Sequence, residues 1–401
     1  MKTGLRLNPA ISSFFHLTCF TIVLGCSSAN QFGRLFFIVR PMINDRLQIT
    51  FVLPFAGTYP CGGIKVVYEY ANHLTRRGHT VTVVHPYWLS GDMPWIKRAK
   101  AAIRYVQRNI DGSYRPDKWF QVDPKVRLTW VPSLAERYIS YSDVVIATAW
   151  ETAEFVNHYS RTKGRPFYLI QHLETWGGHE DRVYATWKMP LKKIVIAQWL
   201  REIAEGLGEE TVLIPNGLDF QQFGLDVRPE DRNQNQLMML YHTLDWKGSA
   251  DGLEALSIVK LQIPGLRATL FGVPAAPASL PDWIEYHQKP AQTKLRELYN
   301  QAAIFLAPSW AEGWPLPPAE AMMCGAALVA TDIGGHREYA IHRETALLSP
   351  PKDANGLAEN ILRLIRDQDF RIKLALQGSA YIQKFTWERA VDRFEAALRE
   401  R

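Results

Sequence analysis

Residues 308–325 read PSWAEGWPLPPAEAMMCG, and this stretch decides the fold class. An apolar run at residues 304–306 precedes it, and a second apolar run at residues 327–330 follows it. Between the two runs, Pro318 is suited to be the first residue of a helix, and Gly325 is suited to end that helix. A strand, a helix and a second strand in this order predict a parallel strand pair joined by a crossover helix.

The same alternation of short apolar runs and amphipathic stretches continues on both sides of this segment. Before residue 215, we expect strands at residues 47–53, 80–84, 144–147, 167–170, 194–197 and 212–214, and helices at 64–77, 152–160 and 198–206. After residue 236, we expect strands at 237–241, 268–271, 304–306 and 327–330, and helices at 251–260, 293–302, 318–324 and 354–366. Apolar strands that do not alternate with polar residues, separated by helices, indicate parallel sheets covered on both faces.

A polar stretch rich in turn residues separates these two series, and 401 residues are enough for two domains. We therefore predict two doubly wound α/β domains, a linker and a closing helix, with bounds at residues 47–214, 237–385, 215–236 and 386–401. Ligands of such sheets bind beyond the carboxyl ends of the strands. The predicted ligand site is a cleft between the two domains, formed by strand-to-helix loops.

Residues 1–46 are interpreted as an N-terminal extension, for which two explanations stay open. Two basic residues precede an apolar run at residues 14–25 that leads into Cys26, as in a signal peptide with a lipoprotein-like cleavage site. Alternatively, the start is mis-assigned and translation begins at Met42, just before the first predicted strand. We prefer the second explanation.

The composition excludes some classes of partner. The formal net charge of +6 is mildly basic, which suits phosphorylated ligands or an anionic membrane face without requiring either. The chain has no zinc-finger, recognition-helix or RNA-stacking pattern, so nucleic acid is not an expected partner. The four cysteines lie far apart without metal-ligand spacing.

The stretch at 308–325 also holds the strongest candidates for chemistry. Glu312 lies on the loop after a strand, and Glu320 is expected in the first turn of the following helix, where the helix dipole favours a carboxylate. The free N–H groups at a helix start bind phosphate well. Because the two prolines between them donate no N–H, Leu316 and Ala319 are the expected donors.

This stretch resembles the Glu–seven residues–Glu motif of the retaining glycosyltransferases of family 4, which have the GT-B fold. Other segments resemble the same family in the same order along the chain, namely Gly62-Gly63 with Arg77-Gly78-His79, Ile214–Asp219, Trp246-Lys247-Gly248 and Thr331–Glu338. Together they cover nearly all of residues 47–400. The resemblance implies two Rossmann-like domains that face a cleft, with a C-terminal helix that crosses back to the first domain.

The resemblance also implies roles for individual residues. Glu320 binds the ribose hydroxyls of a nucleotide, Glu312 holds the transferred sugar near its reacting carbon, and Lys247 neutralises the diphosphate. Four glycines permit close backbone approach to donor or acceptor, with an ordinary tight turn as the alternative for each pair; they are Gly62 and Gly63 on the donor side, and Gly334 and Gly335 on the acceptor side.

The chain departs from the family at one position. Family members usually carry an arginine a few residues before the lysine, whereas this chain has none between residues 240 and 245. His242 stands about where the arginine would be, and His242 or Thr243 is expected to hydrogen-bond a phosphate without supplying a fixed charge. Arg337 is a candidate substitute.

Polar residues that follow strands of the first domain are expected to face the cleft. His172 and Glu174 follow the strand at 167–170, and Thr148 follows the strand at 144–147. We expect His172 to contact sugar hydroxyls or the acceptor, with a structural histidine as the alternative. Glu174 and Thr148 are expected to contact the acceptor.

The predicted function is transfer of a hexose from a nucleotide-diphosphate sugar to a hydroxyl of a glycan or lipid-linked acceptor, with retention, in the assembly of surface polysaccharide or lipopolysaccharide. We expect no cofactor and no metal, because the single Asp-x-Asp, at residues 367–369, follows a helix and is interpreted as a solvated turn away from the cleft. A sugar-nucleotide epimerase and a catalytically weak sugar-nucleotide-binding protein are the alternatives. A cytoplasmic location follows from the donor supply. The basic stretch at 95–108 either contacts an anionic inner-membrane face or is a solvated basic surface.

Overall fold

The computed structural model describes residues 46–89, 95–177, 179–277 and 279–400. Apart from Arg46, the predicted N-terminal extension lies outside the described residues.

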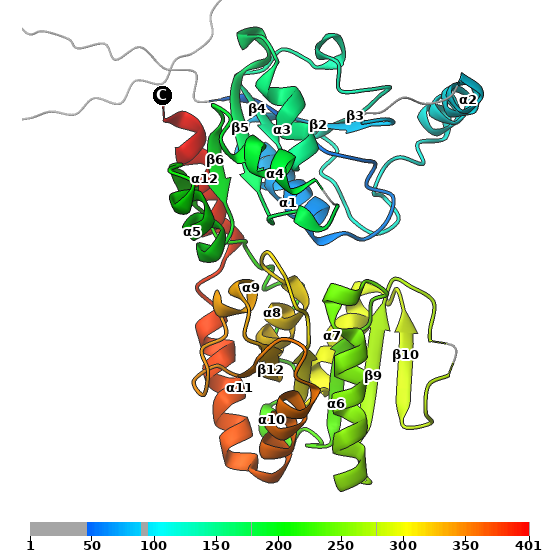
Figure 1. The fold of residues 1–401 in the computed structure, drawn as a ribbon, viewed down its shortest axis with the longest axis vertical. Coiled ribbons are helices and arrows are strands. Elements are labelled where there is room, and N and C mark those ends of the chain that lie inside the picture. The colour runs from blue at the N-terminus through cyan, green and yellow to red at the C-terminus, as the bar shows by residue number, and fades with distance from the viewer. Residues whose placement is uncertain (1–45, 90–94, 178, 278, 401) are drawn as a thin grey trace, which may run out of the picture. The chain divides into compact units, whose positions relative to one another are not determined.

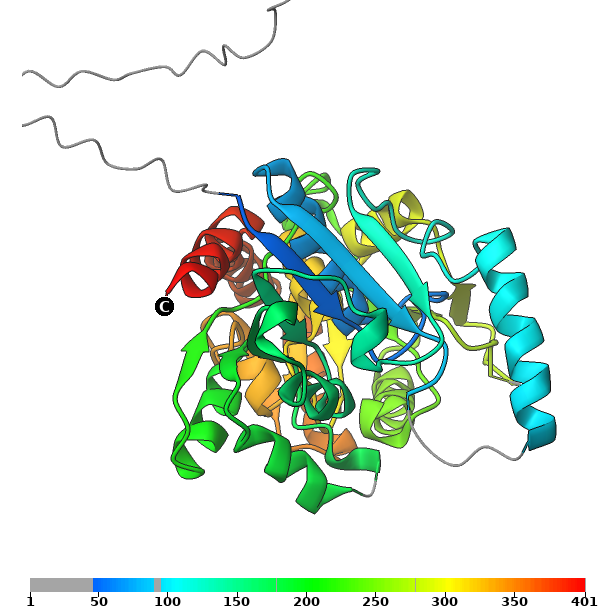
Figure 2. The ribbon, with the colours of Figure 1, turned by 90° about the horizontal axis from the view of Figure 1, so that it is seen from above.

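The first domain is built on a seven-stranded parallel sheet with the strand order β3-β2-β1-β4-β5-β6-β7. The strands are β1 Gln48–Val52, β2 Thr80–Pro86, β3 Arg127–Val131, β4 Val144–Ala147, β5 Arg165–Ile170, β6 Lys192–Val195 and β7 Thr211–Leu213. The helices are α1 Gly62–Arg76, α2 Trp95–Asp111, α3 Trp150–Asn157, α4 Glu180–Trp187 and α5 Gln198–Gly206. Figure 2 looks down onto this sheet. All residues of β4 are buried, as expected of a strand covered on both faces.

The second domain has a six-stranded parallel sheet with the order β10-β9-β8-β11-β12-β13. The strands are β8 Gln236–Leu240, β9 Arg267–Gly272, β10 Ile284–Gln288, β11 Ile304–Ala307, β12 Ala327–Thr331 and β13 Ala346–Ser349. Its helices are α6 Ser249–Gln262, α7 Gln292–Gln301, α8 Leu316–Met323, α9 Gly334–Arg337, α10 Ala354–Arg366 and α11 Gln368–Ile382. The last helix of the chain is α12 Trp387–Arg399 (Figure 1). The two predicted parallel-sheet domains are therefore confirmed.

The strand orders determine where a ligand would bind. In the first sheet β1 lies between β2 and β4, and in the second sheet β8 lies between β9 and β11. The chain thus reverses its direction of winding at β1 and at β8, and such a switch point opens a crevice at the carboxyl ends of the strands. The loop after β1 leads to Gly62-Gly63, and the loop after β8 carries Lys247.

The predicted crossing of the last helix back to the first domain is confirmed. The ring of Phe394 on α12 stacks on Tyr70 of α1 at 4.2 Å between centroids, and it lies 6.1 Å from Phe51 of β1. Glu395 adds an ion pair of 3.0 Å with Arg77. The helix therefore covers the first domain with both apolar and charged contacts.

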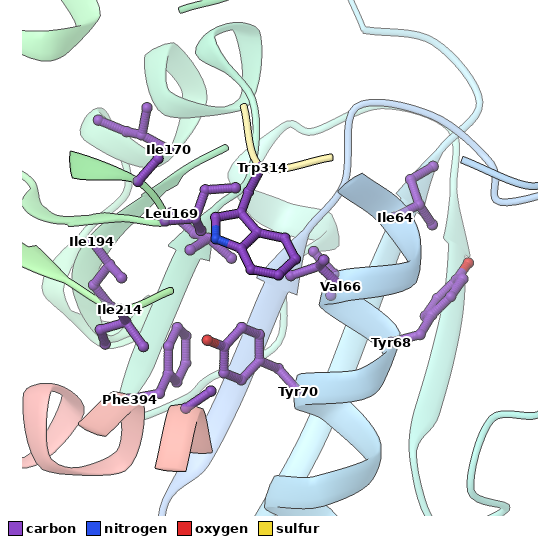
Figure 3. Close-up of a cluster of buried hydrophobic side chains, with 14 of the residues drawn as sticks. Ile64, Val66, Tyr68, Tyr70, Leu169, Ile170, Ile194, Ile214, Trp314 and Phe394 are labelled. Atoms are coloured by element: carbon purple, nitrogen blue, oxygen red, sulfur yellow. The ribbon is translucent and has the colours of Figure 1, made fainter. Parts of the chain in front are cut away.

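One hydrophobic cluster extends across both domains (Figure 3), and the second domain also has a buried cluster of its own. Trp314, from the loop that precedes α8, is only 4% exposed and belongs to the same buried cluster as Val66 of α1 and Leu169 of β5. Its ring also meets Tyr339 of the second domain at 5.0 Å. This indole is thus packed between elements of both domains.

Two local predictions are wrong. The Asp-x-Asp segment is not a turn, because Asp367 caps α11, its side chain accepting the Phe370 N–H at 3.0 Å. Helix α8 begins at Leu316, two residues before the predicted start, with Pro315 as its N-cap.

Candidate functional site

A lysine–glutamate pair lies at the switch point of the second sheet. Lys247 is at the end of the 3-10 turn Asp245–Lys247, and Glu312 is on the loop after β11, the strand next to β8. The Lys247 Nζ donates to both carboxylate oxygens of Glu312, at 2.8 and 2.9 Å. Ser309 donates a third hydrogen bond to Glu312 at 2.9 Å. Burial by itself would raise the pKa of Glu312, but the charge and hydrogen bonds of Lys247 outweigh it and lower that pKa, so the pair is ionic.

The backbone holds this pair in position. Gly248 has a φ of +62°, and a Cβ at this residue would lie 2.0 Å from the carbonyl oxygen of Pro308. The N–H of Trp310 donates to the carbonyl of Trp246 at 2.7 Å. Only glycine permits the two loops to approach this closely, so the loop of Lys247 is docked on the loop of Glu312.

Glu320, the second glutamate of the motif, contacts the other domain. One carboxylate oxygen accepts from Nζ of Lys65 on α1 at 3.0 Å, and the other accepts from the hydroxyl of Tyr299 at 3.2 Å. Glu320 is 6% exposed. Burial would lower the pKa of Lys65, but the charge and hydrogen bond of Glu320, with smaller contributions from Glu69 and Asp219, raise it instead. The pair is therefore an ionic link between α1 and α8.

A narrow pocket surrounds the Lys65–Glu320 pair. Its walls come from α1, the segment before β8, α8 and α12, and are formed by Lys65, Glu69, Gly217, Leu218, Asp219, Gln222, Phe223, Leu316, Glu320 and Trp387. One cation here faces three carboxylates. Burial raises the pKa of Glu69 to about 7, against the opposing charge of Lys65.

The start of α8 differs from the expectation in detail. Because the helix begins at Leu316, Glu320 is its fifth residue and lies beyond the first turn. Ala319 is the fourth residue, and in a regular helix its N–H is the first to bond back to the N-cap carbonyl. Leu316 keeps a free donor position, and it also lines the pocket beside Glu320.

His172 lies in the same neighbourhood as the Lys247–Glu312 pair. The N–H of Glu174 donates to its Nδ1 at 3.4 Å, which leaves the ring proton on Nε2. Burial lowers the pKa of His172 to about 4; the charge of Glu312 raises it and that of Lys247 lowers it. The ring is therefore neutral at pH 7. It packs at 5.4 Å against Trp199, whose indole N–H donates to the carbonyl of Gly313 at 3.0 Å.

The candidates for phosphate binding differ in their hydrogen-bond partners and in their exposure. The Nδ1 of His242 accepts the Leu244 N–H at 3.0 Å, and burial and the charge of Lys247 lower the pKa of His242 below its ordinary value. The neutral ring thus keeps an Nε2 donor beside Lys247. Thr243 is exposed. Arg337 forms two hydrogen bonds with Asp332, at 2.6 and 2.8 Å, so its charge is already compensated.

The predicted glycines lie at or near the contacts between loops. Gly335 packs against the backbone of Glu312, and a Cβ there would lie 2.4 Å from the Glu312 carbonyl oxygen. Gly334 packs on the indole of Trp199. The carbonyl of Gly63 accepts from the side chain of Gln171 at 3.1 Å, whereas Gly62 faces open space.

The two predicted acceptor contacts of the first domain already have partners within that domain. The hydroxyl of Thr148 donates to the carbonyl of Val52 at 2.8 Å, and Thr148 is 6% exposed. Glu174 accepts the Trp150 N–H at 2.9 Å, at the start of α3. Contact with an acceptor would require both side chains to exchange these partners.

Sequence reasoning missed two partners of Glu320. Lys65 stands two residues after Gly63, in the helix turn that the glycine pair opens, and this position is a signal that could have identified it. Tyr299 is on α7, and nothing in its sequence context distinguishes it from an ordinary core tyrosine.

Comparison with protein-family models gives a match over residues 225–380, which runs from the segment before β8 into α11. The matching model is Glycosyl transferases group 1. The similarity to this family covers the segment of residues 225–380. Lys247, Glu312 and Glu320 all lie within it.

Curated relatives match the chain either over a short segment at higher identity or over a longer segment at lower identity. An uncharacterized glycosyltransferase of Methanocaldococcus jannaschii is 33% identical over 92 residues, which are 23% of this chain and 26% of the relative. The O-antigen chain mannosyltransferase B of Escherichia coli is 31% identical over 106 residues, 26% of this chain and 27% of the relative. Glycogen synthase of Mycobacterium tuberculosis is 24% identical over 282 residues, 67% of this chain and 64% of the relative. The matches thus span between a quarter and two thirds of these relatives' length.

Solved structures establish the fold over most of the chain. Sucrose-phosphate synthase from Thermosynechococcus elongatus superposes with a TM-score of 0.68 at 18% identity, over 88% of this chain and 98% of that one. Anabaena HepE in complex with UDP and glucose gives a TM-score of 0.66 at 16% identity, over 88% and 99% of the two chains. The predicted GT-B fold is confirmed. The identity is too low to carry over what these proteins bind.

Among the residues that the structure describes, no helix is both long and apolar enough to cross a bilayer.

Proposed function

We propose that this protein is a hexosyltransferase that moves a sugar from a nucleotide-diphosphate sugar to a hydroxyl of a glycan or lipid-linked acceptor. The observation that carries the proposal is the partly buried Lys247–Glu312 pair, which lies at the switch point of the sheet within the segment similar to group 1 glycosyltransferases. A similar fold was solved with UDP-glucose in Anabaena HepE, and one relative is an O-antigen chain mannosyltransferase. These relatives favour a nucleotide-sugar donor and a role in surface polysaccharide assembly.

The ion pair suggests how the site handles a charged donor. In the ligand-free protein, the charge of Lys247 is balanced by Glu312. A diphosphate placed beside Lys247 would compete for that charge, and the carboxylate of Glu312 would then be free to accept hydrogen bonds from sugar hydroxyls. Glu320 would accept the ribose hydroxyls in the same way, since its present partners are also hydrogen-bond donors.

Transfer must stabilise a sugar with oxocarbenium character and a departing diphosphate. A preorganised donor aimed at the developing charge contributes about 3 kcal/mol. Lys247 supplies such a donor, and the N–H of Leu316 at the start of α8 is a second candidate. We propose that these groups act without a metal ion, and that the departing phosphate accepts the proton of the acceptor hydroxyl on the same face of the sugar. This route gives retention and agrees with the resemblance to family 4.

His172 fits a hydrogen-bonding role better than a role as general base. Its Nδ1 lone pair accepts the Glu174 N–H, and its low pKa of about 4 makes it a poor proton acceptor at pH 7. We propose that Nε2 of His172 donates to a hydroxyl of the sugar or acceptor. Because nucleotide sugars are supplied in the cytosol, the proposal includes a cytoplasmic location.

The test is product formation by Lys247→Met and Glu312→Gln, measured with a panel of labelled nucleotide sugars and a mixed glycan acceptor. We expect each change to reduce transfer about 10²-fold or more. Lys294→Met is the matched control, because Lys294 and Glu297 form an exposed pair on α7. Wild-type transfer by Lys247→Met would refute the proposal. Conversion of the donor without any acceptor would indicate an epimerase, and donor binding without turnover would indicate a binding protein.

A further inference from the structure

An exposed tryptophan stands beside the candidate site. Trp176 lies on the loop after β5 and is 52% exposed. Its ring stacks on Trp246, the residue before Lys247, at 5.8 Å between centroids and 14° between ring planes. The ring of His172 meets the same indole edge-on at 4.6 Å. About half of a large apolar side chain is therefore left in water next to the loop of Lys247.

The loop that carries Trp176 is held in place at two points. Glu174 has a φ of +55°, which is a strained conformation for a residue other than glycine. Its carboxyl group accepts the Trp150 N–H at 2.9 Å, which fixes the loop to the start of α3. The side chain of Gln171 donates to the carbonyl of Gly63 at 3.1 Å, which fixes the loop to the start of α1. The exposed position of the indole is therefore set by the fold.

The first-domain loops at this edge of the sheet carry no fixed positive charge. No lysine or arginine occurs in the segments that follow β1, β4 and β5, which are residues 53–61, 148–149 and 171–179. Lys65, just inside α1, is paired with Glu320. Burial raises the pKa of Glu174 to about 8 and lowers the pKa of His172 to about 4, so both side chains are mainly neutral at pH 7. A ligand that bears phosphate or carboxylate groups would find no cation on these loops.

An aromatic surface beside neutral hydrogen-bonding groups favours a sugar ring as the ligand. One face of a pyranose carries mainly C–H bonds, which pack on an indole, whereas its edges carry hydroxyls that need hydrogen-bond partners. The Nε2–H of His172 lies beside the indole of Trp176 and is available to donate to such a hydroxyl. An acidic or phosphorylated sugar would instead require lysine or arginine.

We propose that Trp176 is a stacking residue for an uncharged sugar ring of the acceptor glycan, the ring that carries the reacting hydroxyl. Trp246 supports the indole from the second domain, and His172 donates to a hydroxyl at the edge of the same sugar ring. The inference rests on the proposed function, because it specifies the class of acceptor. That class is an uncharged oligosaccharide, and not a sugar that bears phosphate or carboxylate groups.

The test is binding of the full chain to an array of uncharged, phosphorylated and carboxylated oligosaccharides, with and without UDP. We expect wild type to bind uncharged glycans. In calorimetry with the uncharged glycan that binds best, Trp176→Ala should lose about tenfold in affinity and Trp176→Phe less, whereas the affinity for UDP should not change. Tyr141→Ala is the matched control and should bind like wild type. Tyr141 is also an exposed aromatic residue, at 71%, but it precedes β4 and so lies at the opposite edge of the same sheet.

The proposal is overturned if wild type binds none of the uncharged glycans, if it prefers the charged ones, or if Trp176→Ala binds the glycan as well as Tyr141→Ala does. A weaker affinity of Trp176→Ala for UDP also overturns it, because the indole would then stack on the nucleotide or only support the loop of Lys247. These measurements involve no turnover, so they are separate from the test of the proposed function. That function fails instead if wild type binds glycan and UDP but transfers no sugar from any nucleotide sugar.

Discussion

Removal of Lys65 tests how strongly the two domains are linked through Glu320. In Lys65→Met the apolar stem is retained and the cation is lost, so the Glu320 carboxylate keeps only the hydroxyl of Tyr299. The side chains of Lys65 and Glu320 are 21% and 8% exposed. Breaking one end of a buried pair costs about 3–5 kcal/mol, because an uncompensated charge stays in a region of low polarity.

We take the lower end, about 3 kcal/mol, because Lys65 is partly solvated and Tyr299 still donates. The double variant Lys65→Met/Glu320→Gln should be more stable than Lys65→Met alone, since it leaves no bare carboxylate. The coupling energy between the two positions should be about 2 kcal/mol.

The assay is urea unfolding of the four proteins of this cycle, followed by tryptophan fluorescence. The exposed pair Lys294–Glu297 gives the reference, and Lys294→Met should change stability by less than about 1 kcal/mol. A Lys65→Met protein as stable as wild type would refute the reasoning. So would strictly additive effects, because they would mean that the two side chains do not interact in solution.

Three further predictions concern the backbone, a titrating carboxyl group and the last helix. Gly248→Ala should lower the free energy of unfolding by at least about 1–2 kcal/mol and impair transfer, because φ is +62° and the added Cβ meets the carbonyl of Pro308. Gly62→Ala is the control in the same urea titration, because a Cβ at Gly62 would face open space. Burial raises the pKa of Glu174 to about 8, with the Trp150 N–H lowering it less. A raised folded-state pKa contributes stability that is complete below the unfolded-state pKa and is lost as the pH rises through about 8. Glu174→Gln should therefore be more stable than wild type at pH 8 and about as stable as wild type at pH 5. Thermal melts across that pH range measure the difference. Phe394→Ala should cost about 3–5 kcal/mol, because the ring is fully buried against α1; a loss below about 1 kcal/mol in urea unfolding would mean that α12 is not docked as described.

The central strands of both sheets could be predicted from the sequence, and the edge strands mostly could not. β4 and β11 consist entirely of buried apolar residues, so each gives an uninterrupted apolar run. β3 and β10 each end a sheet and carry no uninterrupted apolar run, whereas the edge strand β13 has only a short one at residues 346–348. In β10, for example, exposed Glu285 is followed by partly exposed Tyr286 and His287. A strand with one neighbour tolerates polar residues, which weakens the pattern used to find it.

The motif at residues 308–325 could be predicted from the sequence, but the contacts of its two glutamates with distant residues could not. Lys247 and Glu312 were identified separately, and their direct pairing is visible only in the structure. Lys65 and Glu320 are 255 residues apart, and no local pattern connects them. The start of α8 was misplaced because consecutive prolines are compatible with several positions in a first helical turn, where N–H groups are not used by the helix.

The position of Trp314 bears on how the chain can be divided. Its indole belongs to the second domain by sequence but is buried beside residues of the first, at 4% exposure. Cutting the chain in the linker would remove the cover that the first domain gives this ring while Tyr339 and Phe385 stay, at a cost of up to about 2–3 kcal/mol and with an apolar surface exposed to water. A fragment limited to the group 1 segment is therefore expected to aggregate on expression unless Trp314 is replaced by a polar residue.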